Sequence, residues 1–336
     1  MSLVATVADP LTQPAPPGWE EFVAAYGLLP AWDYQLLRTA AWCSQTASSA
    51  VLVRDAASRE PVAAFHARHP GTTDPRRFIG PGRVPAVSIT ECRTAPALGP
   101  GVAFAAGLDD RGRAEAVRRF ERALGARVGV GGRFIAYRAL PERDLAAMPS
   151  TGRIRLRLSP RMVLHNQWPD LEAYLAALPG KWRNRLRRVR QAVVADGTRA
   201  ELTRTIEPAD ACWLSETVNS RYRPRAVPRP PWPAGYFERL NQLPGTRFVT
   251  YRSPAGQLLA FVAMYDTGVE LVAGAWGNRS ETDGGRRHLY FDLYLRQVEW
   301  LLSTGRERLV LGCGMTEIKS RYRARPEPTW GLVGLR

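Results

Sequence analysis

The chain has 336 residues, of which 47 are Lys or Arg and 31 are Asp or Glu, so its net charge is +16. No run approaches the roughly 18 apolar residues of a membrane span, the N-terminus lacks the pattern of a signal peptide, and four widely spaced cysteines argue against a disulfide framework and against zinc. We expect a cytoplasmic protein of one large or two smaller domains. Its charge favours a polyanionic partner, unless arginine serves only to keep the surface solvated.

The first part of the chain predicts a short tail and one α/β domain. The proline-containing residues 1–18 are expected to form a disordered tail, and the domain is expected over 19–150. Apolar residues at helical spacing predict helix over 19–41, with a break at Pro30. Further elements follow in order: a hairpin of strands 49–54 and 61–67, strands 86–91 and 102–106, a helix over 111–125 and a strand over 133–140.

Residues 151–336 predict a second domain of similar construction. Turn residues separate three apolar strands, which indicates an antiparallel meander. A helix too apolar for the surface follows and ends at Gly305. The elements in order are a strand over 154–159, helices over 170–178, 181–195 and 208–222, strands over 247–252, 257–265 and 269–276, a helix over 288–304 and a strand over 308–312. Two units built alike suggest a duplicated fold, although no sequence repeat is visible.

The most basic segment is GKWRNRLRRVRQ, with six basic residues in the ten positions from Lys181 to Arg190. Trp182, Leu186 and Val189 stand at i, i+4 and i+7, which places them on one stripe of a helix. The sequence therefore predicts a helix that is held to a core by one apolar seam and exposes a positive surface.

Lysine is rare in this chain, because only Lys181 and Lys319 depart from arginine among the 47 basic residues. Lysine is a compact charge with movable donors and a tunable pKa, whereas arginine is a planar and permanently charged fork. Lys319 also follows a predicted buried strand, and the ends of such strands are where α/β proteins gather their sites. Lys319 is therefore a candidate functional residue.

The C-terminal run VAGAWGN…HLYFDLYLRQVEWLLSTGRERLVLGCGMTEIKSRYRARPEP resembles FemABX-like members of the GNAT acyltransferase superfamily, of the peptidoglycan-biosynthesis type. The matching features are Trp-Gly after the meander, His-Leu-x-Phe at the helix start, a Gly-containing strand end, and Glu-x-Lys followed by Arg and Pro. LEAYLAALPGKWRNRLRRVRQAVVADG resembles the family's pair of helices. The resemblance covers about 165–330 and is only topological before 150. It implies an α/β fold with a mixed sheet and tandem GNAT domains.

Such enzymes move an amino acid from aminoacyl-tRNA onto an amine, whereas ordinary GNAT enzymes use acyl-CoA. The loop NRSETDGGRRHLYF lacks the Arg or Gln that the CoA loop requires before Gly284 and Gly285, although Arg286 and Arg287 could assist an anion there. A tRNA donor accounts better for the basic helix. The expected tRNA-binding residues are Lys181, Arg183, Arg185, Arg187, Arg188, Arg190, Arg221, Arg223 and Arg225. Trp232 and Tyr236 would either stack on an unpaired base or pack in the core.

The catalytic candidates are Lys319, Glu317 and His288, of which Lys319 matches by resemblance the lysine of FemABX enzymes implicated in transfer. Lys319 would stabilise the oxygen that becomes negative during transfer, and Glu317 would share its side of an extended strand; the alternative is a surface ion pair with Arg321. His288 would act as a base or bind the acceptor, or else serve as a structural hydrogen-bonding group. Expected substrate-binding residues are Trp276, Tyr290, Arg321 and Tyr322. Four histidines without ligand spacing predict no metal, and no nucleophile motif predicts covalent catalysis.

The leading hypothesis is an aminoacyl-tRNA-dependent aminoacyltransferase that forms an amide on a small acceptor, such as a cell-wall or antibiotic precursor. It needs no cofactor beyond its co-substrate, and its oligomeric state is open. The alternatives are an N-acyltransferase that uses acetyl-CoA or another acyl-CoA and, from another class, a non-catalytic nucleic-acid-binding protein.

Overall fold

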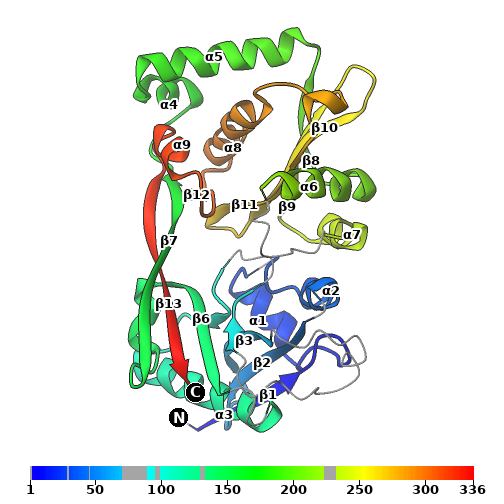
Figure 1. Ribbon diagram of the computed structural model, residues 1–336. Helices are drawn as coiled ribbons and strands as arrows, with labels where there is room; N and C mark the ends of the chain where they lie inside the picture. Colours follow the sequence, from blue (N-terminus) through cyan, green and yellow to red (C-terminus); the bar gives the residue numbers. More distant parts are fainter. Residues whose placement is uncertain are drawn as a thin grey trace. The chain divides into compact units, whose positions relative to one another are not determined.

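The chain divides into two compact units, one of Met1–Ser159 with Pro328–Arg336 and one of Pro160–Glu327. The border thus lies after Ser159 and not after residue 150, and the end of the chain returns to the first unit (Figure 1). No described helix is long and apolar enough to cross a membrane. The structure, a computed structural model, describes residues 2–28, 30–44, 46–69, 89–94, 99–128, 133–222 and 232–336, with the side chains of residues 221 and 222 left aside.

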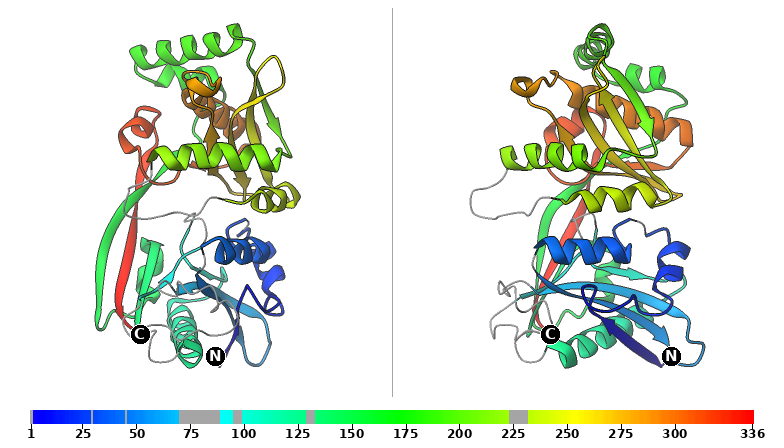
Figure 2. Two further views of the ribbon diagram at one scale, coloured as in Figure 1. Left: turned by 45° about the vertical axis from the view of Figure 1, so that its right-hand side comes forward. Right: turned by 90° about the vertical axis from the view of Figure 1, so that its right-hand side faces the viewer.

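The first unit is a sheet with helices on both faces, in the strand order β1-β2-β3-β4-β6-β13-β7, with β5 beside β3. Helices α1 and α2 pack on one face and α3 on the other (Figure 2). The elements are β1 (Leu3–Ala8), α1 (Trp19–Ala25), α2 (Tyr34–Ser44), β2 (Ala47–Asp55), β3 (Pro61–His69), β4 (Ile89–Cys92), β5 (Val102–Phe104), α3 (Asp110–Val128), β6 (Phe134–Pro141), the 3₁₀ helix η3 (Glu142–Ala147), β7 (Arg153–His165) and β13 (Arg325–Leu335).

The two faces of the β2–β3 hairpin carry separate cores, because side chains alternate along a strand. Leu52 and its neighbours on one face pack with α1 and α2. Val51 and Phe65 on the other face pack with α3, where Phe65 stacks on Phe120 with 4.3 Å between ring centroids. The predicted hairpin and the helix over 111–125 are confirmed.

The disordered tail over 1–18 is a wrong prediction for β1. Leu3–Ala8 pairs antiparallel with β2 from Leu3↔Asp55 to Ala8↔Ala50, and the Leu3 side chain is only 1% exposed. Strand β1 is short, and the prolines that suggested disorder all follow it. The pairing with β2 supplies the hydrogen bonds and the apolar contact that order this segment.

The second unit has the strand order β7-β12-β11-β10-β9-β8, in which β9, β10 and β11 form the predicted antiparallel meander. Helices α4, α5 and α8 cover one face of the sheet, and α6 and α7 pack on the other. The elements are α4 (Leu171–Ala177), α5 (Gly180–Ala195), β8 (Arg199–Thr203), α6 (Pro208–Tyr222), α7 (Ala234–Gln242), β9 (Thr246–Arg252), β10 (Leu258–Asp266), β11 (Glu270–Asn278), the 3₁₀ helix η4 (Glu281–Asp283), α8 (Leu289–Thr304), β12 (Arg308–Val310) and α9 (Thr316–Arg321).

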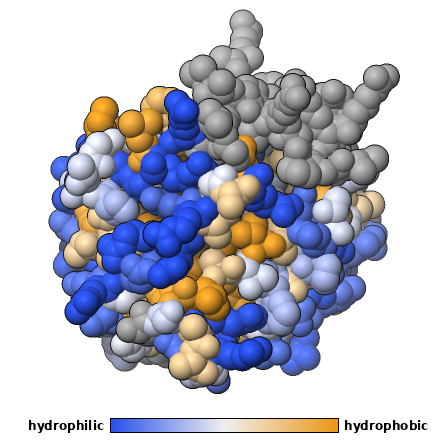
Figure 3. Space-filling model, turned by 90° about the horizontal axis from the view of Figure 1, so that it is seen from below, coloured by the Kyte–Doolittle hydropathy of each residue, from blue (hydrophilic) through white to orange (hydrophobic). Residues whose placement is uncertain are grey.

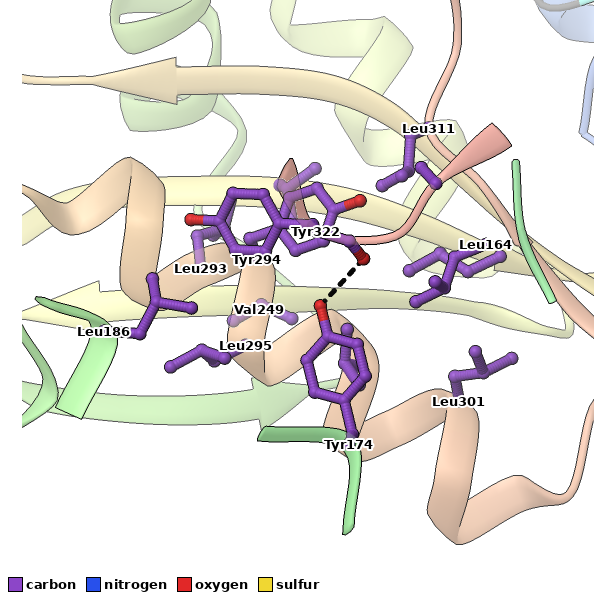
Figure 4. Packing of buried hydrophobic residues seen from close by; sticks show 14 of the residues in the cluster. Leu164, Tyr174, Leu186, Val249, Leu293, Tyr294, Leu295, Leu301, Leu311 and Tyr322 are labelled. Carbon is purple, nitrogen blue, oxygen red and sulfur yellow. Dashed lines mark hydrogen bonds between the residues drawn. The ribbon is translucent and has the colours of Figure 1, made fainter. Parts of the chain in front are cut away.

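A cluster of tyrosines ties the helices of the second unit to one another (Figure 4). The Tyr174 hydroxyl donates to the carbonyl oxygen of Tyr322 at 3.0 Å, and the ring of Tyr294 stacks on that of Tyr322 at 3.7 Å. Tyr322 has no exposed surface, so it is a core residue and not the substrate-binding residue that the sequence predicts.

Apolar residues are interspersed with hydrophilic ones on one face of the molecule (Figure 3). Figure 3 shows one face of the molecule, on which hydrophilic residues predominate and apolar residues lie between them. Apolar atoms always form part of a folded surface, so this dispersion does not by itself mark a site.

Candidate active site

Strand β11 has a side that its neighbour does not cover. β12 pairs with it in parallel at Glu270–Val272 and then ends at Val310, whereas β11 continues to Asn278. Residues 272–276 are half-buried along this stretch, although Leu258–Tyr265 of the adjacent β10 are all buried. Residues 273–276 are therefore partly exposed where β12 no longer pairs with β11.

A β-bulge lies where β12 ends. Val262 pairs with Trp276 and Met264 with Ala273, so Gly274 and Ala275 together face one residue of β10. Gly274 is required here, because a Cβ atom on it would lie 2.3 Å from the ring of Tyr265. Bulges of this kind bend a strand and redirect side chains next to functional sites.

The loop before α8 brings His288 to the same region. Gly285 is enclosed, since a Cβ atom there would lie 2.3 Å from the carbonyl oxygen of Arg279. His288 directly precedes α8 with a φ of 65°, a backbone conformation uncommon for a residue other than glycine. Its side chain is exposed, its ring lies 6.1 Å from that of Phe291, and the rings of Trp276 and Tyr290 lie 5.6 Å apart.

Lys319 is buried in α9 and holds the end of the neighbouring strand. Its Nζ atom donates to the carbonyl oxygens of Leu311 at 2.7 Å and of Gly312 and Cys313 at 3.3 Å. Burial lowers its pKa to about 8. The loop that it holds is tightly turned, with positive φ at Gly312, Gly314 and Met315. All three ammonium protons thus have acceptors in the chain's own backbone.

Glu317 does not share a side with Lys319, and that prediction is wrong. Residues Thr316–Arg321 form a helix and not an extended strand, so side chains two positions apart point about 200° away from each other. Glu317 is exposed and forms an ion pair with Arg321 at 2.5 Å. The surface ion pair, which the sequence left open as an alternative, is what the structure has.

The predicted basic helix is confirmed as α5, and its apolar seam is buried. The seam consists of Trp182, Leu186, Val189 and Val193. At 100° per residue, the basic side chains fall into two stripes, one on each side of this seam. The first stripe is Arg183, Arg187 and Arg190, and the second, which we call the outer stripe, is Lys181, Arg185 and Arg188.

The first stripe faces the protein itself. Arg183 donates to the carbonyl oxygen of Ala176 at 3.3 Å, Arg187 pairs with Glu172, and Arg190 pairs with Glu299 of α8 at 2.5 Å. These arginines therefore fasten α5 to α4 and α8. The outer stripe is exposed, and the described residues place no carboxylate within ion-pair distance of its three members.

The remaining predicted RNA contacts either lie outside the described residues or, for Tyr236, in the core. Residues 223–231, with Arg223 and Arg225, and the side chain of Arg221 lie outside the described residues. Tyr236 is 1% exposed and stacks on Trp232 with 4.3 Å between the ring centroids. For Tyr236, core packing is thus the correct alternative of the two that the sequence left open.

Two arrangements were missed by sequence reasoning. Asp292 is fully buried in α8, where it accepts a 2.7 Å hydrogen bond from the Tyr251 hydroxyl and pairs with Arg296, so it anchors α8 to β9. The other is a contact of Arg185 and Arg321 with the indole ring of Trp182. An acidic residue within an apolar helix was a visible signal for the first, and only tertiary structure reveals the second.

The arginines of the α8 loop are partly engaged by acidic side chains. Arg287 pairs with Glu281 at 2.7 Å, and Arg286 lies 4.0 Å from Asp196. Both were expected to assist an anion at the start of α8. Because each has a carboxylate nearby, the loop offers less positive charge to a ligand than the sequence suggests.

Solved structures resemble this chain over nearly its whole length, whereas no protein-family model and no curated protein matches it. L-PGS from Bacillus licheniformis has a TM-score of 0.61 at 12% identity, covering 96% of this chain and 92% of that one. FemX has a TM-score of 0.59 at 8% identity, covering 99% and 97%. The C-terminal DUF2156 domain of a candidate lysylphosphatidylglycerol synthetase from Agrobacterium fabrum has a TM-score of 0.56 at 16% identity, covering 90% and 87%.

Proposed function

Because the chain has the GNAT/FemABX-like fold, which acyltransferases share, we propose that it transfers an amino acid from aminoacyl-tRNA onto the amine of a small acceptor. The observation that supports a tRNA donor is the outer stripe of Lys181, Arg185 and Arg188. Its charges are exposed and have no acidic partner in the described residues, so they are available to phosphates. Each phosphate that they neutralise releases counterions and adds affinity that does not depend on sequence.

The uncovered side of β11 is where we place the reaction. The acceptor nitrogen attacks the ester carbonyl carbon, a C–N bond forms, and the carbonyl oxygen gains negative charge. The C–O bond to the ribose then breaks, and the proton lost by the amine passes to the departing hydroxyl oxygen. Backbone N–H groups on the side of β11 that β12 leaves uncovered beyond Val272 are suited to stabilise that negative oxygen, an effect worth about 3–4 kcal/mol per donor in other acyl transfers.

The residues around β11 have separate roles in this proposal. Lys319 acts as a positioning residue, because its ammonium group holds the carbonyls of 311–313 where β12 separates from β11. His288 is exposed at the start of α8 and binds or deprotonates the acceptor amine. Trp276 and Tyr290 are half-buried and form an aromatic surface beside the accessible stretch of β11.

An assay with competing donors tests this proposal. The purified protein is incubated with aminoacyl-tRNA labelled in the amino acid, and separately with acetyl-CoA, each with a set of small amines. We expect labelled amide to form from aminoacyl-tRNA only when an amine is present. Amide formation from acetyl-CoA alone would assign the acyl-CoA donor instead. Tight, salt-sensitive tRNA binding without turnover of either donor would assign the non-catalytic role.

Two double variants, one in the outer stripe and one elsewhere on the surface, test whether the outer stripe itself binds the charged tRNA. Replacing Lys181 and Arg188 with glutamine should raise the KM for charged tRNA and leave kcat close to that of the wild type, because these residues lie away from the reacting atoms. Replacing Arg118 and Arg122 with glutamine, two exposed arginines of α3 in the first unit, removes the same charge elsewhere and should leave the KM unchanged.

A further inference from the structure

Two arginines from different helices lie over one tryptophan in the second unit. The guanidinium carbon of Arg185 in α5 is 5.1 Å from the centroid of the Trp182 ring and 4.8 Å from that of Phe291. The guanidinium carbon of Arg321 in α9 is 5.8 Å from the same Trp182 ring. The indole is itself fixed, because it is only 8% exposed and packs edge-on against Phe291 and Tyr322.

This arrangement orients the two guanidinium groups before any ligand arrives. A guanidinium held on an aromatic face loses much of its freedom, while its N–H edge remains available for hydrogen bonds. Arg185 is exposed and has no acidic partner among the described residues. Arg321 is half exposed and shares its charge with the exposed Glu317. A phosphate can therefore engage Arg185 directly and compete with Glu317 for Arg321.

The pair also lies beside both parts of the proposed machinery. Arg185 belongs to the outer stripe of α5, and Phe291 follows His288 by three residues at the start of α8. Arg321 is two residues beyond Lys319 in α9. A chain of phosphates that runs along the outer stripe toward β11 would therefore reach this pair before it reaches His288.

We propose that Arg185 and Arg321 bind neighbouring phosphate groups close to the acyl end of the donor; we call this pair the phosphate clamp. The proposal rests on the acyl-transfer function. For an aminoacyl-tRNA donor, the ligand is the backbone of the unpaired 3′ end. The pyrophosphate of an acyl-CoA presents the same chemistry, so the two sources are separated by experiment.

Binding of small probes isolates the clamp from the rest of the outer stripe. The probes are a short single-stranded RNA that ends in CCA and, separately, coenzyme A, measured by calorimetry at fixed salt with the full chain. Arg185→Lys keeps the charge and loses the planar group, and we expect it to weaken RNA binding about tenfold. Arg321→Lys should act in the same direction. Arg122→Lys, at an exposed arginine of α3 in the first unit without a described ring contact, is the control and should change binding less than twofold.

Glu317→Gln gives a result in the opposite direction. Removing the carboxylate frees Arg321 from its ion pair, so we expect RNA to bind about twofold to fivefold more tightly at low salt. A variant that merely perturbed the fold would not strengthen binding. Unfolding curves of all four variants should superimpose on that of the wild type, since the altered groups lie on the surface.

The outcomes separate the clamp from the proposed donor. If coenzyme A binds and RNA does not, and the arginine variants weaken coenzyme A, the clamp stands and the tRNA donor is wrong. If RNA binds with strong salt dependence, yet Arg185→Lys weakens it no more than Arg122→Lys does, the donor proposal stands and the clamp is wrong. If neither probe binds to the wild type, both are wrong.

Discussion

The Nζ atom of Lys319 lies 2.7 Å from the carbonyl oxygen of Leu311, although eight residues separate them in the chain. With the further contacts to Gly312 and Cys313, this side chain gathers three carbonyls at the end of β12. Lys319 was expected to act on the substrate. Its ammonium group instead donates hydrogen bonds to three backbone carbonyls of the chain itself. We therefore expect Lys319 to contribute to acyl transfer by fixing the backbone conformation of residues 311–315.

Replacing Lys319 with arginine or methionine should lower kcat about tenfold to hundredfold with little change in the Kd for the donor. Arginine keeps the charge, but its wide planar group cannot place three donors within the space of an ammonium group that is 6% exposed. Single-turnover rates measure the effect. Hydrogen exchange of residues 311–315 should accelerate in both variants, and an unchanged exchange rate would contradict a positioning role. If the arginine variant turns over at the wild-type rate, only the positive charge at position 319 matters and the geometry of the ammonium group does not.

The unfolding free energy of the wild type, measured relative to that of Lys319→Met, should increase when the pH rises from 7.5 to 9.5. The pKa of Lys319 is lowered from 10.5 to about 8 by burial, so the folded protein releases this proton while the unfolded chain still holds it. Because the unfolded state then binds more protons, the unfolding free energy increases with pH across this window, by about 1–2 kcal/mol. Denaturant unfolding at the two pH values gives the difference between wild type and variant. A constant difference would mean that the lysine titrates normally.

The two stripes of α5 should respond differently to charge removal. Lys181→Gln with Arg188→Gln should reduce the slope of log affinity against log salt for tRNA by about two units, because two phosphate contacts are lost. Folding should be unaffected. Arg187→Gln with Arg190→Gln should leave the slope nearly unchanged and lower the unfolding free energy by about 1 kcal/mol, because Glu172 and Glu299 lose their partners. If the salt slope instead changed for Arg187→Gln with Arg190→Gln and not for Lys181→Gln with Arg188→Gln, tRNA would bind the first stripe and not the outer stripe.

Two buried histidines should make the first unit sensitive to acid. Burial lowers the pKa of His66 to about 4 and that of His69 to about 3, and the ring of His69 lies between the hydroxyls of Ser49 and Thr90 at 3.1 Å. As the pH falls from 6.5 toward 4, the two histidines bind protons in the unfolded chain but not in the folded protein. The free energy of unfolding therefore decreases. From pH 7 to 4.5 we expect a loss of about 2 kcal/mol per histidine. Hydrogen exchange in β2 and β3 measures this loss, and His69→Gln should reduce it.

Most of the fold could be predicted from the sequence, and it was. The mixed α/β fold is confirmed, and it is similar to that of FemX and L-PGS over nearly the whole chain. The meander, α5 and α8 were found because long apolar patterns carry a clear period. The strands β1, β8 and β13 were missed, since they are short or rich in proline and charge, and their partners are distant in the chain.

The candidate site was harder to predict, for a physical reason that Glu317 and the arginines of α5 illustrate. Residue type and spacing showed that Lys319 was unusual and that α5 was basic. They did not show that residues 316–321 turn into a helix, which separates Glu317 from Lys319. Nor did they show that three of the five α5 arginines find carboxylates or carbonyls on α4 and α8. Partners of this kind come from tertiary packing, which local sequence patterns do not encode.

The position of β13 has a consequence for the order in which the protein folds during synthesis. β13 lies between β6 and β7 in the sheet of the first unit, yet the ribosome makes it after the entire second unit. Until residues 325–335 emerge, β6 and the first half of β7 lack the strand that joins them and present unpaired edges, which favour aggregation. The second unit is thus the first that can complete its sheet, and the first unit must wait until β13 has been translated.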